Sequence, residues 1–251
     1  MSHRTQGDWF ETARGRYLLA WEHAAFDRKL VDIFGFNAVQ FGMCNHDFLR
    51  ANRMPNRIMC SDMAVAGVSA ASVLASEHEL PFASQSLDLV VLPHVLEFVN
   101  RPHEVLREVE RVLLPEGHVL ISTFNPMSLW GMRRVMSGHM GEFPWTGQYL
   151  SVLRLKDWLS LLGFEHRSAA SGCFAPPLSS EVWLRRWSFM ESTGRYCWPF
   201  GGAVTLLHAV KKVPGMRVIA PNWRDMQRAG KKSMVPAANH HGKTGAGDVF
   251  S

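Results

Sequence analysis

The sequence predicts an α/β fold in which a mostly parallel, doubly wound sheet carries helices on both faces. The first observation is Leu87–Leu92, a nearly continuous apolar run that is typical of a parallel strand buried on both sides. The second is the helical pattern that follows, because Val105, Leu106 and Val109 recur at helical spacing with charged residues between them. The third is a further apolar strand, His118–Phe124. Strand, helix and strand form a right-handed crossover, the repeating unit of such sheets.

The remaining elements follow from periodicity and from turn residues. Helical spacing predicts helices over Arg14–Phe34, Leu155–Leu162 and Ser180–Ser192. Short apolar runs predict strands over Asn37–Phe41, Arg57–Cys60, Ala71–Ala75, Phe164–Ser168 and Ala203–Val210. The helix before His118 is expected to have Asn100 as its N-cap and Pro102 in its first turn. Residues 125–149 are expected to form a loop with a short helix.

The 251 residues suggest one domain with appendages. We expect an N-terminal lead-in over 1–12, the domain over 13–214 with a lid insertion over 176–200, and a basic, disordered tail over 215–251. The formal net charge is +5, but residues 211–251 hold eight Lys and Arg against two Asp. That balance of +6 leaves −1 for the first 210 residues, so the folded body is not predicted to bind nucleic acid.

Composition excludes several classes of protein. The four cysteines, Cys44, Cys60, Cys173 and Cys197, have no paired spacing of a zinc or redox site. The polar N-terminus has no apolar core of a signal peptide, and no apolar run approaches 18 residues. We therefore expect a cytoplasmic protein with no metal and no membrane partner.

One block of the sequence resembles a known family. It contains Leu80-Pro81-Phe82 before a polar turn, Asp88 at the start of a strand, His94-Val95-Leu96-Glu97 after that strand, and a turn with Pro115 and Gly117. From Leu80 to Pro126 this pattern resembles the class I S-adenosylmethionine-dependent methyltransferases of the type 11 group. Phe124–Gly131 and Asp157–Phe164 resemble an uncharacterised bacterial subgroup of them.

The resemblance implies a Rossmann-like methyltransferase fold whose C-terminal strand is antiparallel. It implies S-adenosyl-L-methionine as the cofactor and methyl transfer to an unidentified acceptor, which we expect to be a small molecule. The first strand of this family usually ends in an acidic residue and a loop with three glycines. Here Gln40 stands at the acidic position and Gly42 is the one glycine of the loop. The stretch from Gly42 to Leu80 is also about one helix short.

In open α/β sheets the ligand lies at the carboxyl ends of the strands, where the strand order reverses. Asp62 follows Gly42 by 20 residues, the spacing expected for a contact to the ribose. Ser76 replaces the family's usual Asp, so Glu77 or His78 is expected near the adenine. His94 is expected to border the cofactor, and it is the first choice for a general base if the acceptor must lose a proton. The predicted cofactor contacts are Phe41, Gly42, Met43, Asp62, Glu77, His78, Leu92, Pro93 and His94.

Other assignments remain open at this point. Asn125 and Pro126 follow a strand and could line the acceptor site, and Glu97 could orient His94 or face solvent. The aromatic stripe with Trp183, Trp187 and Phe189 is more typical of core packing than of a lid over an apolar substrate. The alternative function is a catalytically inactive binding or scaffold protein whose basic tail contacts nucleic acid. A nicotinamide-dependent dehydrogenase is disfavoured because its glycine fingerprint is missing.

Overall fold

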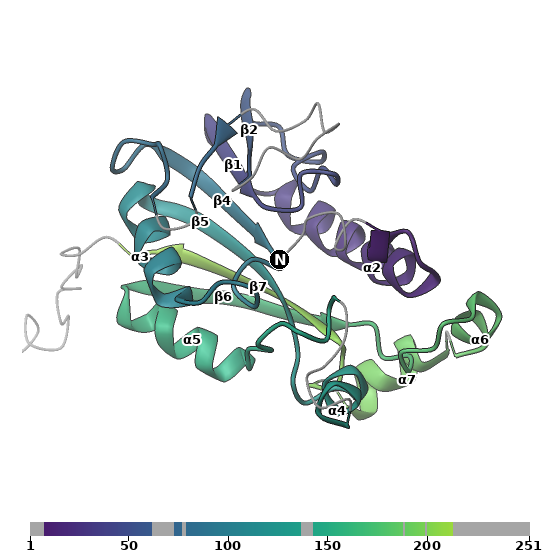
Figure 1. Ribbon diagram of the computed structural model, residues 1–251. Coiled ribbons are helices and arrows are strands. Elements are labelled where there is room, and N and C mark those ends of the chain that lie inside the picture. The colour runs from purple at the N-terminus through teal and green to yellow at the C-terminus, as the bar shows by residue number, and fades with distance from the viewer. Residues whose placement is uncertain are drawn as a thin grey trace, which may run out of the picture. The chain divides into compact units, whose positions relative to one another are not determined.

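The computed structural model describes residues 8–61, 73–76, 79–136, 143–187, 189–198 and 200–212 (Figure 1). These residues all belong to one of the two units into which the chain divides, Met1–Pro214. Asp62, Glu77 and His78, three of the predicted cofactor contacts, lie outside the described residues, as does the expected basic tail.

The core of the unit is a seven-stranded sheet with the order β3-β2-β1-β4-β5-β7-β6. Strands β1 to β5 pair in parallel, while β7 is antiparallel to both β5 and β6. This confirms the predicted mostly parallel, doubly wound sheet with an antiparallel C-terminal strand. The strands are β1 Asn37–Phe41, β2 Asn56–Ser61, β3 Val73–Leu74, β4 Leu87–Pro93, β5 Leu113–Phe124, β6 Phe164–Gly172 and β7 Val204–Lys211.

Helices cover both faces of the sheet. Apolar side chains of α2 pack on one face with Ala38, Leu89 and Val91, while α3 and α5 pack on the opposite face with Val39 and Val90 (Figure 1). This alternation along β1 and β4 follows from the two-residue period of a strand. The helices are α2 Ala13–Leu30, α3 Pro102–Val112, α4 Leu129–Met136, α5 Val152–Leu161, α6 Glu181–Arg186 and α7 Phe189–Cys197.

The connection from β1 to β2 differs from an ordinary crossover. Within 42–55, all of which the structure describes, the chain forms turns and no helix. This agrees with a sequence that is about one helix short in this region. The loop buries Phe48 and Leu49 in the same core cluster as α2, so its own apolar side chains take part in covering this face of the sheet.

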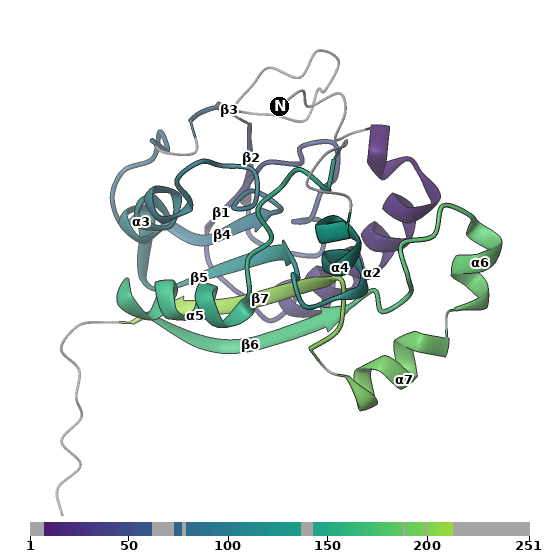
Figure 2. The same cartoon turned by 60° about the horizontal axis from the view of Figure 1, so that its bottom comes forward.

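Four local expectations differ from the structure. The N-cap of α3 is Arg101 rather than Asn100, because Pro102 occupies the first helical position and the cap is the residue before it. The helix predicted over Ser180–Ser192 is two short helices, α6 and α7. Trp183 and Phe189 are exposed, so the core reading of the aromatic stripe is wrong for them, because these helices lie beyond the edge of the sheet (Figure 2). Within the expected lead-in, Trp9 and Phe10 are buried in the core.

Candidate functional site

The carboxyl ends of β1 and β4 bring two of the predicted cofactor loops together. The two strands are parallel neighbours, with Val39 paired to Val90 and Gln40 to Val91, so the loops that follow them start at the same edge of the sheet. A Cβ atom placed on Gly42 would lie 2.9 Å from Cγ2 of Val95 and 3.8 Å from the carbonyl oxygen of Pro93. The predicted contacts Gly42 and Pro93 are therefore neighbours at this edge.

Gly42 is the residue at which the backbone requires glycine. Its φ of +83° lies in the left-handed region, and Met43 after it has a φ of +46°. The Gly42 amide donates a hydrogen bond to the carbonyl oxygen of Cys60 at 2.9 Å, which ties the loop to the end of β2. A side chain at Gly42 would meet both backbone strain and the Val95 side chain, so this loop approaches the β4 loop only because Cβ is absent.

The side chain of Gln40 fixes the backbone of the loop that follows β1. Its side chain is fully buried, and Nε2 lies 3.1 Å from the carbonyl oxygen of Gly42, 3.3 Å from that of Met43 and 2.8 Å from that of His46. Its Oε1 accepts a hydrogen bond from the Phe48 amide at 2.9 Å. A carboxylate could not donate to these carbonyl groups. The side-chain amide of Gln40 therefore fixes the backbone path of this loop, which contains a single glycine.

A buried group of three ionisable side chains, which we call the His94 cluster, lies beside these loops. His94 follows β4 with a φ of +50°, and its Nδ1 lies 3.0 Å from Oε1 of Glu97. Its Nε2 lies 2.9 Å from Oε1 of Glu22 on α2, an ion-pair contact without hydrogen-bond geometry. All three side chains are fully buried. Oε1 of Glu97 also accepts the Phe124 amide at 2.7 Å, so the cluster joins α2, the β4 loop and the end of β5.

Electrostatics in the His94 cluster favour the charged imidazole. Burial alone lowers the pKa of His94, but the neighbouring carboxylates of Glu22 and Glu97 outweigh it and raise the pKa to about 10. The raised pKa favours the imidazolium form of the ring at neutral pH. Among the described residues, Oε2 of Glu22 and Oε2 of Glu97 have no hydrogen-bond partner. The general-base role expected for His94 stays a prediction, and it requires that one carboxylate first move away from the ring.

Aromatic side chains close over this edge of the sheet. The Phe10 ring centroid lies 5.6 Å from that of His46 in the β1 loop and 6.4 Å from that of His94 in the β4 loop. Phe143 lies 5.4 Å from Phe10 on the same side. Burial lowers the pKa of His46, so this ring favours the neutral form. Burial and then the charge of Glu97 raise the pKa of Tyr149, whose hydroxyl has no partner among the described residues.

The other predicted site residues serve the core or the backbone. Phe41, Met43 and Leu92 are buried in the hydrophobic clusters on the two faces of the sheet. Nδ2 of Asn125 donates to the carbonyl oxygens of Phe200 at 2.6 Å and Gly202 at 3.0 Å. Those contacts fasten the end of β5 to the segment that enters β7, and a place beside the acceptor stays a prediction for Asn125.

Sequence reasoning missed two residues of this region, Glu22 and the structural role of Gln40. Glu22 could have been noticed, because it lies four residues after Leu18 and four before Phe26 on the buried face of α2. A glutamate on such a face needs a charged or hydrogen-bonded partner. Gln40 carried the weaker signal of standing where the family usually has an acid. Among the residues that the structure describes, no group of three His, Cys, Asp or Glu side chains could hold a metal ion.

Comparisons with known proteins find similarity to methyltransferases. The family model described as "Methyltransferase domain", of type 11, matches residues 42–121. The uncharacterized protein YafS of Escherichia coli (strain K12) is 36% identical over 130 residues, which cover 49% of this chain and 54% of that protein. A malonyl-[acyl-carrier protein] O-methyltransferase of Laribacter hongkongensis is 34% identical over 94 residues, or 38% of this chain and 31% of that enzyme. The matched part thus spans about half the length of the first relative and about a third of the second.

Solved structures extend the likeness to the whole sheet. A SAM-dependent methyltransferase of Thermotoga maritima superimposes with a TM-score of 0.57 at 18% identity, covering 78% of this chain and 94% of that one. At that identity the likeness establishes the fold. Residues 42–121 therefore match the type 11 methyltransferase domain model, in a chain that has the fold seen in SAM-dependent methyltransferases.

Proposed function

We propose that this protein is an S-adenosyl-L-methionine-dependent methyltransferase that holds its cofactor at the carboxyl edge of β1 and β4. The observation that carries the proposal is Gly42, which has a φ of +83° at the end of β1 and packs against the β4 loop inside the matched domain. A glycine, which has no Cβ atom, allows a nucleoside to approach the backbone of the loop closely.

The residues of this edge fit a cationic cofactor. In the His94 cluster, Oε2 of Glu22 and Oε2 of Glu97 are buried and have no hydrogen-bond partner among the described residues. The sulfonium and ammonium groups of S-adenosylmethionine are both positive, and carboxyl oxygens beside these loops would attract them. The proposed ribose contact, Asp62, and the proposed adenine contacts, Glu77 and His78, complete the assignment from the sequence.

When bound, the cofactor supplies an electrophilic methyl group, and S-adenosylhomocysteine is the leaving group. The chain's contribution is to fix the loops after β1 and β4 and to exclude water from their buried side. Orientation of this kind accounts for much of the rate gain in a displacement between two bound molecules. The acceptor we propose is a small molecule, and the expected place of the reaction is the cytoplasm.

A thermal-shift or calorimetric titration with S-adenosylmethionine and S-adenosylhomocysteine tests the proposal. A ligand present at 100 times its dissociation constant should raise the free energy of unfolding by about 2.7 kcal/mol. Absence of any shift at millimolar concentrations of both compounds would contradict the proposal and favour a scaffold protein. Binding without product, across a panel of small-molecule acceptors, would favour the inactive binding protein.

Gly42→Ala, paired with Gly163→Ala, makes the test specific to the site. Both glycines have a φ of +83°, so both substitutions add the same backbone strain. A Cβ atom at Gly163 meets nothing within 4 Å, whereas one at Gly42 meets Val95. We expect Gly42→Ala to weaken cofactor binding at least about tenfold, the effect of about 1.4 kcal/mol, and Gly163→Ala to leave it unchanged. Equal binding by the two variants would show that the cofactor lies elsewhere.

A further inference from the structure

Exposed apolar side chains are concentrated at one end of the fold. Of the sixteen large hydrophobic side chains that are exposed in the described part of the chain, ten lie within 127–136 and 181–200. We call the described residues of these two segments the apolar cap. It comprises α4, α6 and α7, which Figures 1 and 2 both show at the same end of the sheet. Exposed apolar side chains gathered at one end of a fold are a sign of an interaction site.

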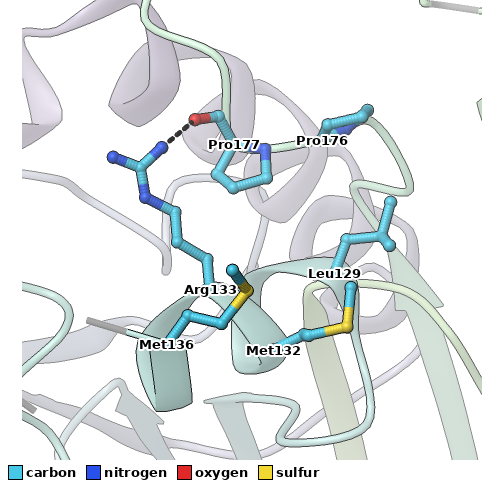
Figure 3. Close-up of a pocket in the computed structure, with 6 residues that line it drawn as sticks. All are labelled: Leu129, Met132, Arg133, Met136, Pro176 and Pro177. Carbon is cyan, nitrogen blue, oxygen red and sulfur yellow. Dashed lines mark hydrogen bonds between the residues drawn. The ribbon is translucent and has the colours of Figure 1, made fainter. Parts of the chain in front are cut away.

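The apolar cap has an aromatic part and a methionine part. Its exposed aromatic side chains, on or beside α6 and α7, are Trp183, Phe189, Tyr196, Trp198 and Phe200. Its methionine part includes Met132 and Met136 of α4, which line a pocket of about 400 Å³ with Leu129, Pro176 and Pro177 (Figure 3). Tyr196 is 90% exposed and Met136 is 82% exposed, so both side chains are largely in contact with solvent.

The apolar cap also carries charged side chains. Those that the structure describes are three arginines, Arg133, Arg134 and Arg186, and two glutamates. One acid, Glu181, pairs with Arg16, and the other, Glu191, accepts hydrogen bonds from Tyr17 and from the Phe174 amide. Both acids therefore already have partners within the chain.

We propose that the apolar cap docks this protein on the surface of an anionic lipid bilayer. Trp and Tyr are enriched at the membrane interface because their rings are apolar and their N–H and O–H groups are polar. Arginine beside them adds attraction to anionic headgroups. Arg186 already lies 5.5 Å from the Trp183 ring centroid, which places a cation beside an exposed indole. The helices of the described residues are too short or too polar to cross a membrane, so the contact is interfacial.

Charge favours a bilayer over a second copy of this chain. A symmetric dimer would place the cap against itself, so that like charges such as Arg186 of the two copies would meet. An anionic surface instead complements that charge. Residues 213–251, which lie outside the described residues, hold six further Lys and Arg against two Asp. Their charge would add to the attraction without explaining why apolar side chains gather on the cap.

The sequence led to the expectation of no membrane partner because no apolar run is long enough to span a bilayer. An interfacial contact needs no such run, because its apolar side chains come from separate short helices. The inference does not depend on methyl transfer, since vesicle binding is measured without cofactor or acceptor.

Co-sedimentation of the full chain with lipid vesicles tests the proposal. One set of vesicles is phosphatidylcholine alone, and the other contains phosphatidylglycerol. We expect binding to the anionic vesicles that weakens as salt is raised, with little binding to the neutral ones. Absence of binding to anionic vesicles would overturn the proposal.

The variant Trp183→Ala/Tyr196→Ala assigns the binding to the cap. We expect its partition coefficient on anionic vesicles to fall about tenfold or more, because two aromatic anchors are lost. Leu153→Ala/Leu161→Ala is the matched control, because both leucines are also exposed, at 78% and 80%, but lie on α5. Unchanged binding by the cap variant would assign the affinity to another part of the chain, such as the basic 213–251. A concentration-dependent dimer that the same substitutions dissociate would make the cap a self-association surface instead. Either result overturns the proposal.

Discussion

At the scale of single residues, the side-chain amide of Gln40 holds the loop after β1 through three carbonyl oxygens. The family's usual acid would place an oxygen, rather than an N–H, toward the carbonyl groups of Gly42, Met43 and His46. The sequence revealed that the acid was replaced. It could not reveal the replacement's role, because the partners of Nε2 depend on how the loop returns beneath β1.

Gln40→Glu should therefore destabilise the protein although it restores the family's usual residue type. One carboxylate oxygen would keep the Phe48 amide as its donor, but the other would face three carbonyl oxygens, at a cost of about 3–5 kcal/mol that falls when the acid is protonated. We expect chemical denaturation to give that loss at pH 7 and a smaller loss near pH 4.5. Gln148→Glu, at an exposed position, is the control. Equal stability of Gln40→Glu and the native chain at pH 7 would contradict the role assigned to Nε2.

The His94 cluster makes stability depend on pH. His94 has a pKa of about 10 in the folded state against about 6.5 when unfolded, so its contribution is complete below pH 6.5 and is lost as pH rises toward 10. Between pH 7 and 8.5 we expect the free energy of unfolding to fall by up to about 1.4 kcal/mol per pH unit.

His94→Gln should reduce that slope and also lower stability, because two buried carboxylates lose their cation. His208→Gln is the control, since burial and His118 lower the pKa of His208 to about 4 and its ring is neutral throughout the same range. Urea denaturation at several pH values measures both slopes. A slope that persists in His94→Gln would show that His94 is not the group that titrates.

At the scale of elements, β4 and β5 could be predicted because each is an apolar run, and α3 because its apolar side chains recur at helical spacing. The short apolar run of β1 and the helical period of α5 were equally informative. The break between α6 and α7 could not be predicted, since Ser180–Ser192 keeps a helical pattern while only Leu184 among its described side chains is buried. Without a core to pack against, apolar spacing does not fix where a helix ends.

Contacts with α3 explain the Leu80-Pro81-Phe82 motif. Arg111 of α3 donates to the carbonyl oxygens of Leu80 and Phe82, at 3.1 and 3.0 Å, and Glu108 accepts the Leu80 amide at 2.9 Å. The hydrogen bond from Arg111 lowers the pKa of Glu108, which keeps it ionised. Two residues of the helix therefore hold the segment that leads into β4.

Arg111→Met should release this segment. Two carbonyl groups and one carboxylate lose their donor, at a cost of about 1–3 kcal/mol. We expect faster amide hydrogen exchange at Leu80 than in the native chain, with little change in the centre of β4. Arg101→Met is the control, because Arg101 is exposed and pairs only with exposed Glu104 among the described residues. Equal acceleration by the two variants would contradict the assigned contacts.

At the scale of the whole molecule, the mostly parallel sheet with its antiparallel C-terminal strand could be predicted, but the contacts that close its carboxyl edge could not. Right-handed crossovers and the family resemblance are enough for the sheet. Glu22 and His94 are 72 positions apart, and no local pattern pairs them. Phe10 is a similar case, since a short segment before the first long helix gave no sign that it would pack across the carboxyl edge.

Phe10→Ala tests whether this N-terminal aromatic closes the edge of the sheet. Phe10 contacts His46, His94 and Phe143, so its removal leaves a cavity between segments that are distant in sequence. Such a truncation costs about 3–5 kcal/mol, and each kcal/mol lowers the Tm of a domain of this size by about 2–4 °C. Phe34→Ala removes the same ring from an exposed position and should leave the Tm within about 1–2 °C of the native value. An equally small shift in Tm for Phe10→Ala would mean that the N-terminal segment packs on the surface of a fold that is already complete without it. A large one would mean that the fold is complete only with its N-terminal segment in place.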